Sequence, residues 1–299
     1  MRYHVVDRDL RGLPPREQWC PICKLQHGLA IFSGCNLSHC RHIQEKLNGI
    51  SLKSVREFLT REEDSIVFSL IERAKYPYNA PVYDPSYLGF TFHNHSLIEL
   101  FVRETEALQA KAGRYQNPEE VPFFPEDLIL PLVPPYKYPQ ELHPVAASVN
   151  VSTTIWHMYF DRVLPQFTSK GNDGKYAQTA EADLICLQAL SRRIHYGRFV
   201  AEVKFRAAPK DYITAIKAKD SDGLMRLLTS ASQEEIVKRR VEEKAKVFGQ
   251  DVTLDTKGET TSNHSKYKVD PMVVYSLYSD WVIPLTKLVE VEYLLHRLD

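Results

Sequence analysis

The first candidates for chemistry are two basic side chains on one predicted helix. Arg193 and Lys204 are separated by three helical turns between about residues 179 and 205, so both project from the same side. The other sides carry apolar residues such as Leu190 and Ile194, which can pack against neighbouring helices. A buried cation needs a partner, and a bound anionic ligand can supply one. The alternative is two surface cations on an amphipathic helix.

A second candidate is a carboxylic acid within an almost wholly apolar C-terminal helix. Thr286 and Glu290 lie one turn apart, and Ile283 flanks them on the same face. A buried carboxyl group needs either a partner or a proton. The alternative is a structural Glu–Arg pair inside a helical bundle.

The elements that must position these residues are predicted to be helices. Apolar residues recur at helical spacing from residue 51 onward, and no strand-like alternation of useful length occurs. We therefore predict an all-α fold, with one large bundle-like domain over residues 49–299. The predicted helices span about residues 51–75, 96–111, 148–165, 179–205, 211–217, 221–228, from 232 onward, and 271–299.

Local signals refine these boundaries. Ser51 is a candidate N-cap of the first helix, and Gly113 ends the second as a C-terminal cap. Pro284 predicts a kink in the last helix. Arg56 lies on the first helix, one position off its apolar stripe, and taken alone it is typical of a surface charge. The proline-rich stretch 117–144 forbids a continuous helix and predicts an ordered loop packed on the body.

Charge composition narrows the possible partners. The 299 residues include 38 Lys and Arg and 38 Asp and Glu, so the formal net charge is zero. This balance argues against nucleic acid and against an acidic membrane surface as partners, and no apolar run is long enough to span a bilayer. The basic run from Lys238 to Lys246 alternates with glutamates, which favours a solvated helix face over a nucleic-acid interface.

Residues 1–48 differ from the rest of the chain, because they hold four of its five cysteines. Cysteines and histidines close in sequence can bind zinc, and the candidates here are Cys20, Cys23, Cys35 and Cys40, with His27, His39 and His42 nearby. Their spacing is loose, and no periodic element supports a site. Acidic residues and few serines also disfavour a plastid transit peptide. We expect a poorly ordered N-terminal extension without a metal.

Four stretches of the chain resemble eukaryotic chorismate mutases, and above all the plant enzymes. They are the helix Arg61–Arg73, the stretch Pro122-Phe123-Phe124-Pro125, the segment Ser191-Arg192-Arg193-Ile194-His195-Tyr196-Gly197 and the C-terminal segment Pro284–Leu295. The resemblance runs from about Gly49 to Asp299 and leaves out residues 1–48. It implies an all-helical homodimer that converts chorismate to prephenate, toward phenylalanine and tyrosine, with an active site inside the helix bundle of each subunit.

The implied reaction is a pericyclic rearrangement of a compact dianion. A C–O bond breaks as a C–C bond forms, and negative charge grows on the ether oxygen. Such a reaction needs no nucleophile, metal or cofactor, only a chair-like bound conformer and hydrogen-bond donors at that oxygen. The resemblance assigns the substrate carboxylates to Arg56 and Arg193, aided by the Thr286 hydroxyl. It assigns the ether oxygen to Lys204 and Glu290.

The remaining site residues also come from the resemblance. Glu234 would receive the ring hydroxyl of the substrate, and Val200 and Ile283 would form the apolar wall. Ser230 stands where the fungal enzymes have asparagine, so a shorter side chain serves the substrate-binding loop. An alternative is a helical dimer that has lost catalysis and only binds partners, but all the polar positions hold competent residues.

Regulation is predicted to be absent. In regulated members of this family, aromatic amino acids bind at the dimer interface, where a Gly-Ser pair lets the effector approach the backbone. The aligned pair here is Ala177-Gln178, while the opposing element keeps Gly113 and Arg114. Ala177 adds a Cβ atom that restricts the backbone where the effector must approach closely. The longer side chain of Gln178 lies where the effector would bind. We predict a remnant of the allosteric pocket that no longer binds aromatic amino acids. Because this resembles the unregulated plant form, which works in the cytosol, we expect a cytosolic rather than a plastid enzyme.

Overall fold

The computed structural model describes residues 49–88, 95–250 and 267–299. The chain separates into the units Met1–Ile50 and Ser51–Asp299, and all the elements described below belong to the second unit. The N-terminal extension expected over residues 1–48, and the zinc ligands considered within it, lie outside the described residues. Both therefore stay predictions.

The described part of the second unit is all-α, as predicted. It contains no strand, only one isolated antiparallel bridge between Gln250 and Tyr267. In the same residues no helix is long and apolar enough to cross a bilayer. The α-helices are α3 (Leu52–Arg73), α4 (Leu97–Lys111), α5 (Ser152–Met158), α6 (Leu164–Phe167), α7 (Tyr176–His195), α8 (Gly197–Ala207), α9 (Pro209–Lys217), α10 (Ser221–Leu228), α11 (Ala231–Gly249), α12 (Pro271–Leu277) and α13 (Ile283–Leu295).

Shorter turns complete the fold. Five 3₁₀ turns lie in the described connections, and two π-helical turns, η8 (Tyr159–Val163) and η9 (Tyr278–Val282), join α5 to α6 and α12 to α13. The 3₁₀ turns are Ala80–Val82, Pro85–Leu88, Arg114–Gln116, Pro125–Asp127 and Pro144–Ser148.

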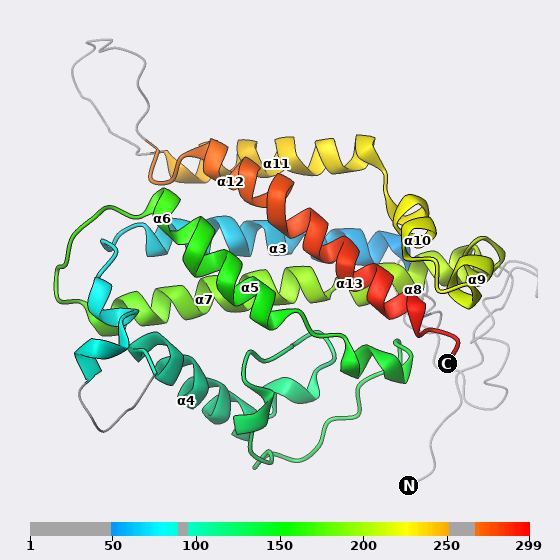
Figure 1. Ribbon diagram of the computed structural model, residues 1–299, viewed down its shortest axis with the longest axis horizontal. Coiled ribbons are helices and arrows are strands. Elements are labelled where there is room, and N and C mark those ends of the chain that lie inside the picture. Colours follow the sequence, from blue (N-terminus) through cyan, green and yellow to red (C-terminus); the bar gives the residue numbers. More distant parts are fainter. Residues whose placement is uncertain (1–48, 89–94, 251–266) are drawn as a thin grey trace, which may run out of the picture. The chain divides into compact units, whose positions relative to one another are not determined.

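The long helix α3 forms the centre of the second unit. It lies between α7 and α11, while the α12–α13 segment crosses the bundle and packs on α11, α8 and α10 (Figure 1). Leu190 and Ile194 of α7 are fully buried in the shared core, which confirms that the apolar sides of this helix face other helices. Burial of such side chains stabilises each by about 1.5–3 kcal/mol relative to exposure.

The capping signals in the sequence are confirmed. Ser51 and Ser54 form a reciprocal capping box at the start of α3. Ser96 accepts the backbone N–H of Glu99 at the start of α4. Gly113, just beyond α4, has a φ of +84°, a left-handed conformation that glycine adopts with little cost.

The helix predicted from residue 179 to 205 is in fact two helices. α7 ends at His195 and α8 begins at Gly197, with Tyr196 between them at φ −63° and ψ −11°. The Tyr196 ring is stacked between Phe58, at a centroid distance of 3.8 Å, and Phe199, at 4.5 Å. Hydrophobic spacing did not reveal this break, because the apolar pattern continues through it.

Two prolines lie inside helices rather than at their ends. We expected a helix to end near Pro165, but it continues to Phe167. In both places the proline is the second residue after a π-helical turn, η8 before Pro165 and η9 before Pro284. A proline has no N–H and its ring clashes with the carbonyl four residues earlier in a regular α-helix. The wider π turn accommodates both effects, so each helix continues.

Gly197 sets the spacing between α8 and α13. A Cβ atom on Gly197 would lie 2.7 Å from the Thr286 carbonyl oxygen and 3.2 Å from the nearest Val289 methyl group. Because the nearest atom belongs to the backbone, it cannot move aside by a simple side-chain rotation. Only glycine therefore allows α13 to lie this close to the start of α8.

We predict that Gly197→Ala destabilises the protein although alanine favours helix. The added methyl group must push α13 away from α8, at about 1–3 kcal/mol in the free energy of unfolding. Gly249→Ala is the matched control, because its Cβ would meet no atom closer than 3.7 Å and alanine gains up to about 1 kcal/mol in a helix. Urea unfolding of both variants measures the difference. Equal stability of the two would contradict the close-packing account.

Candidate active site

A cavity of about 250 Å³ opens between α3, α7, α8, α11 and α13. It brings together side chains from segments that are more than 200 residues apart in the sequence. Every residue expected from the sequence to contact substrate lines this cavity: Arg56, Arg193, Val200, Lys204, Ser230, Glu234, Ile283, Thr286 and Glu290.

Arg193 is a buried cation with unused hydrogen-bonding capacity. Its side chain comes from the last turn of α7 and the residue is 5% exposed. Its Nη1 donates to Thr286 Oγ1 at 3.3 Å, and that hydroxyl donates in turn to the Val282 carbonyl at 2.6 Å. Its buried Nε has no hydrogen-bond partner among the described residues. A planar guanidinium with an unused N–H donor is suited to bind a carboxylate in the cavity.

Lys204 and Glu290 form the charged pair of the cavity. Lys204 Nζ lies 3.0 Å from Glu290 Oε2 and also donates to the Leu228 carbonyl at 3.1 Å. Burial raises the pKa of the Glu290 carboxyl above its ordinary value, and the Lys204 ammonium offsets part of this increase. The site therefore holds an acid that keeps its proton to higher pH than an exposed glutamate.

The alternative of a Glu–Arg pair inside the bundle does not describe Glu290. The arginine of the last helix, Arg297, instead binds Glu202, with Nε–Oε2 and Nη2–Oε1 distances of 2.6 and 3.0 Å. Tyr293 donates its hydroxyl to the same carboxylate at 2.5 Å. This structural cluster leaves Glu290 to the cavity.

The α10–α11 connection forms one rim of the cavity. Ser230 is exposed at the N-cap position of α11, and Glu234 is half-buried one turn later. The Glu234 carboxylate accepts from Lys287 Nζ at 3.1 Å. Lys287, which also lines the cavity, follows Thr286 directly and was not singled out from the sequence.

Opposite this rim, Arg56 is exposed on α3 and faces the mouth of the cavity. Its position off the apolar stripe of α3 is confirmed, but the tertiary structure turns the exposed side toward the cavity. Val200 and Ile283, which are 7% and 8% exposed, supply buried apolar wall. The lining of the cavity therefore includes both buried apolar side chains and an exposed arginine.

The sequence did not reveal an ion-pair cluster that lies beside the cavity, between α3 and α11. We expected the run from Lys238 to Lys246 to be a solvated face, and Arg239 is indeed exposed. However, Arg240 donates to Glu63 at 2.6 and 2.7 Å, and Lys244 Nζ lies 3.1 Å from the same carboxylate. Glu63 is fully buried on α3. The two cations turn inward because α11 packs on α3, a contact that the charge pattern does not reveal.

Arg198 does not enter the cavity. On helical spacing alone, Arg198 is predicted to point away from Arg193 and to matter far less for turnover. It is nevertheless 5% exposed, and its guanidinium donates to the carbonyls of His195, Ala146 and Pro118 at 2.8–3.0 Å. Removal of Arg198 would deprive these three carbonyls of their side-chain donor. Arg198 is therefore a structural residue and is unsuitable as a neutral control for Arg193.

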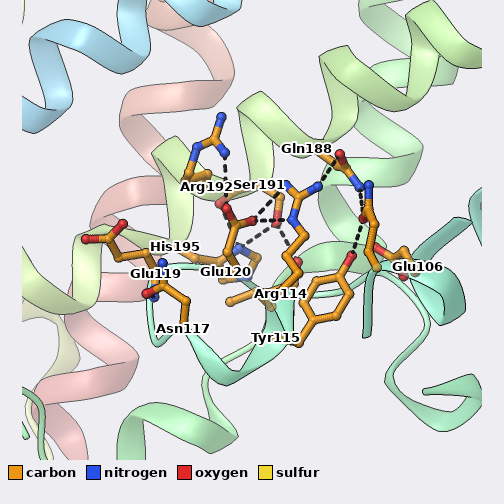
Figure 2. A network of polar contacts seen from close by, with 12 residues as sticks. Glu106, Arg114, Tyr115, Asn117, Glu119, Glu120, Gln188, Ser191, Arg192 and His195 are labelled. Atoms are coloured by element: carbon orange, nitrogen blue, oxygen red, sulfur yellow. Dashed lines mark hydrogen bonds and ion pairs between the residues drawn. The ribbon is translucent and has the colours of Figure 1, made fainter. Parts of the chain in front are cut away.

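A second cavity of about 620 Å³ includes part of the expected allosteric remnant. Arg114 and Gln178 line it, whereas Gly113 and Ala177 are not among its lining residues. The Arg114 guanidinium is already engaged, with Nη1 2.7 Å from Gln188 Oε1 and Nη2 2.8 Å from Glu120 Oε2 (Figure 2).

A continuous polar network joins this second cavity to the active-site helix. Glu120 also accepts from Arg192 at 3.1 Å (Figure 2). Arg192 Nε donates in addition to Glu62 on α3 at 2.8 Å. Arg192 is the neighbour of Arg193 on α7, but its side chain points to the opposite side. The network therefore fixes the end of α7 without using the cavity cations.

The described residues bring together no group of three or more His, Cys, Asp and Glu side chains able to hold a metal ion. What they do bring together is a set of cations around a small cavity, with one buried acid whose pKa is raised. Such a set can bind a compact dianion and supply hydrogen bonds to a developing negative charge.

Comparison with known proteins identifies the family. Residues 175–291 match the family model described as chorismate mutase type II. The chain is 58% identical to the cytosolic chorismate mutase 2 of Zea mays, over 84% of this chain and 97% of that protein. A solved structure of the chorismate mutase AtCM1, with phenylalanine bound in its allosteric site, superimposes with a TM-score of 0.75 at 50% identity. It covers 84% of this chain and 97% of that one.

A further relative corrects one expectation. The chloroplastic chorismate mutase 1 of Petunia hybrida is 46% identical over 95% of this chain and 91% of its own length. A match of that extent includes most of residues 1–48, so the likeness does not begin only near Gly49. Relatives named for the cytosol and for the chloroplast thus both align with this sequence. The identities and the coverage together show that the chain belongs to the chorismate mutase family.

Proposed function

We propose that the chain performs its family's reaction, the rearrangement of chorismate to prephenate, in the cavity that contains Lys204 and Glu290. The observation that carries this proposal is the short contact between an ammonium group and a buried carboxyl group of raised pKa. Both can donate hydrogen bonds to one oxygen atom. Direct loss of chorismate absorbance on mixing tests the proposal, and an inactive helical dimer would show no loss.

Substrate binding is proposed to use the cations of the cavity. Arg193, with its unpaired Nε, would take one substrate carboxylate together with the Thr286 hydroxyl. Arg56 at the mouth would take the other. A guanidinium can engage a carboxylate through two parallel hydrogen bonds, which fixes orientation as well as charge. Two such contacts would hold the dianion in its compact, reactive conformer.

Catalysis is proposed to come from charge stabilisation alone. As the C–O bond breaks, negative charge grows on the ether oxygen, where the Lys204 ammonium and the protonated Glu290 carboxyl would donate. Both groups are held by protein contacts before the substrate arrives, so little reorganisation is needed. Glu234 would accept the ring hydroxyl, with Ser230 beside it on the rim. Val200 and Ile283 would exclude water from the apolar face of the ring.

The protein is also proposed to act as a homodimer in the cytosol. Its similarity to the cytosolic relative from Zea mays supports that location, as does the Ala177-Gln178 pair in place of Gly-Ser. The long match to the chloroplastic Petunia protein supports the plastid alternative. A fluorescent protein fused to the C-terminus of the full chain distinguishes the two locations, and light scattering measures the dimer.

We predict that Glu290→Gln flattens the alkaline side of the rate profile. Glu290 donates only while protonated, so activity is full below its folded-state pKa and falls as pH rises through that pKa. Burial moves this decline above the ordinary glutamate range. Glutamine donates at every pH. Steady-state kcat/KM from acidic to alkaline pH is the measurement, and an unchanged alkaline loss in the variant would rule out the proposed role.

We predict that Arg193→Ala lowers kcat/KM by roughly 10²- to 10³-fold, because one buried substrate carboxylate loses its partner. Arg193→Lys should lose less, since it keeps the charge but not the fork geometry. Turnover assays on both variants, with urea unfolding as the check on folding, measure the effect. A loss for lysine as large as that for alanine would show that charge is not what this position supplies.

We predict that phenylalanine, tyrosine and tryptophan leave the rate unchanged. Gln178 lines the second cavity, and Arg114 there is already bonded to Glu120 and Gln188. An effector acts only through different affinity for two states, and these side chains should prevent its binding. The assay is turnover at subsaturating chorismate with each amino acid in millimolar excess. A change beyond about twofold, roughly 0.4 kcal/mol of coupling, would overturn both this prediction and its support for the cytosol.

A further inference from the structure

Two cations that line the cavity have no role in the proposed function, Arg240, which is bound to Glu63, and Lys287. Lys287 follows Thr286 on α13, and its side chain is 19% exposed. Its Nζ lies 3.1 Å from Glu234 Oε1 and 3.4 Å from Thr229 Oγ1. Lys287 therefore connects α13 to both ends of the segment 229–234, which forms the rim of the cavity.

Lysines from two different helices bind the start of this segment and the residue before it. Lys204 of α8 donates to the Leu228 carbonyl at 3.1 Å, and Lys287 of α13 reaches the next residue, Thr229. The remaining hydrogen bonds of the rim are local, such as that from Thr229 Oγ1 to the Met225 carbonyl at 2.7 Å. Thr229 and Ser230 are both exposed, and Ser230 makes no side-chain cap to its helix. A half-buried carboxylate such as Glu234 can take several rotamers, and each one populated weakens any ordered contact to a ligand.

We infer that Lys287 is a positioning residue for the hydroxyl end of the substrate, which holds the Glu234 carboxylate over the cavity. The inference rests on the proposed function and deepens it, because it adds a residue that acts through Glu234. Glu234 must be ionised and correctly oriented to accept a hydrogen bond from the hydroxyl group of the substrate. An ammonium group at 3.1 Å fixes one carboxylate oxygen of Glu234, which leaves the other for the ligand.

The same ammonium has a second effect, on Glu290. Lys287 is one turn before Glu290 on α13, and its charge opposes the burial that raises the Glu290 pKa. Loss of Lys287 should therefore raise that pKa further and shift the alkaline decline of activity to higher pH. The other charged or titratable groups near Glu290 or around the cavity stay in place; they are Lys204 on α8, Arg193 on α7, Tyr212 on α9, Glu234 and Arg240 on α11, and Arg56 and Glu63 on α3.

The test is the variant Lys287→Met, which keeps the length of the side chain and removes its charge. We expect KM for chorismate to rise about tenfold, the effect of one hydrogen bond to a charged group, with kcat within about twofold. The alkaline limb of the kcat/KM profile should move to higher pH. Lys287→Arg, which keeps a cation within reach of Glu234, should restore most of the affinity.

Two comparisons separate positioning from a structural effect. Lys219→Met removes a lysine that also binds a carboxylate and a carbonyl, Asp299 and Leu295 near the end of α13, and it should leave KM and the pH limb unchanged. In a Glu234→Gln background, Lys287→Met should raise KM no further, because it acts through the missing carboxylate. A double-mutant cycle measures this coupling.

The possible results distinguish a failure of the proposed function from a failure of the inference about Lys287. If the parent protein does not convert chorismate, the proposed function and this inference both fail. If the parent is active but Lys287→Met leaves KM within twofold, only the inference fails. If the variant raises KM equally with and without Glu234, Lys287 contacts the substrate directly and the positioning role is wrong. An unmoved alkaline limb would contradict only the proposed effect of Lys287 on the Glu290 pKa.

Discussion

The contact between Lys204 and Glu290 is the interaction on which the site depends. Two ionisable groups in a small, largely buried cavity influence each other strongly, because little water screens them. Burial favours the neutral carboxyl, while the ammonium favours the carboxylate. The balance between these effects decides how many hydrogen-bond donors face the cavity at a given pH. This contact exists only because α8 lies very close to α13, and Gly197 permits that approach.

The last helix also has to present its polar face at the correct angle. Pro284 would interrupt a regular helix, but the π-helical turn before it lets the chain continue. The Thr286 hydroxyl then donates to the Val282 carbonyl, within the region where the proline has removed a backbone donor. That bond fixes the rotamer of Thr286 and leaves its oxygen free to accept from Arg193. A backbone irregularity therefore supports a substrate-facing side chain.

Ion pairs between helices surround the cavity and keep its walls in place. Glu63 of α3 is bound by Arg240 and Lys244 of α11. On the other side of α3, Glu62 is bound by Arg192 of α7. Each pair is at least partly buried, so loss of one partner would leave a charge without compensation. These contacts explain how α3 can carry two adjacent buried carboxylates, Glu62 and Glu63, at the centre of a bundle.

The sequence by itself predicted the helical class, most helix boundaries and nine of the residues that line the cavity. Helical spacing is a local property, and the family resemblance rested on long motifs such as Ser191–Gly197. Tertiary structure alone decided which charges turn inward. Arg240 and Lys244 were predicted to lie on a solvated face because charge alternation does not specify the neighbouring helix. Arg198 was predicted to matter little because two of its carbonyl partners, Ala146 and Pro118, lie in distant connections. Gly197 and Lys287 acquired their importance in the same way, from atoms of α13 and α11 that only folding brings within contact distance.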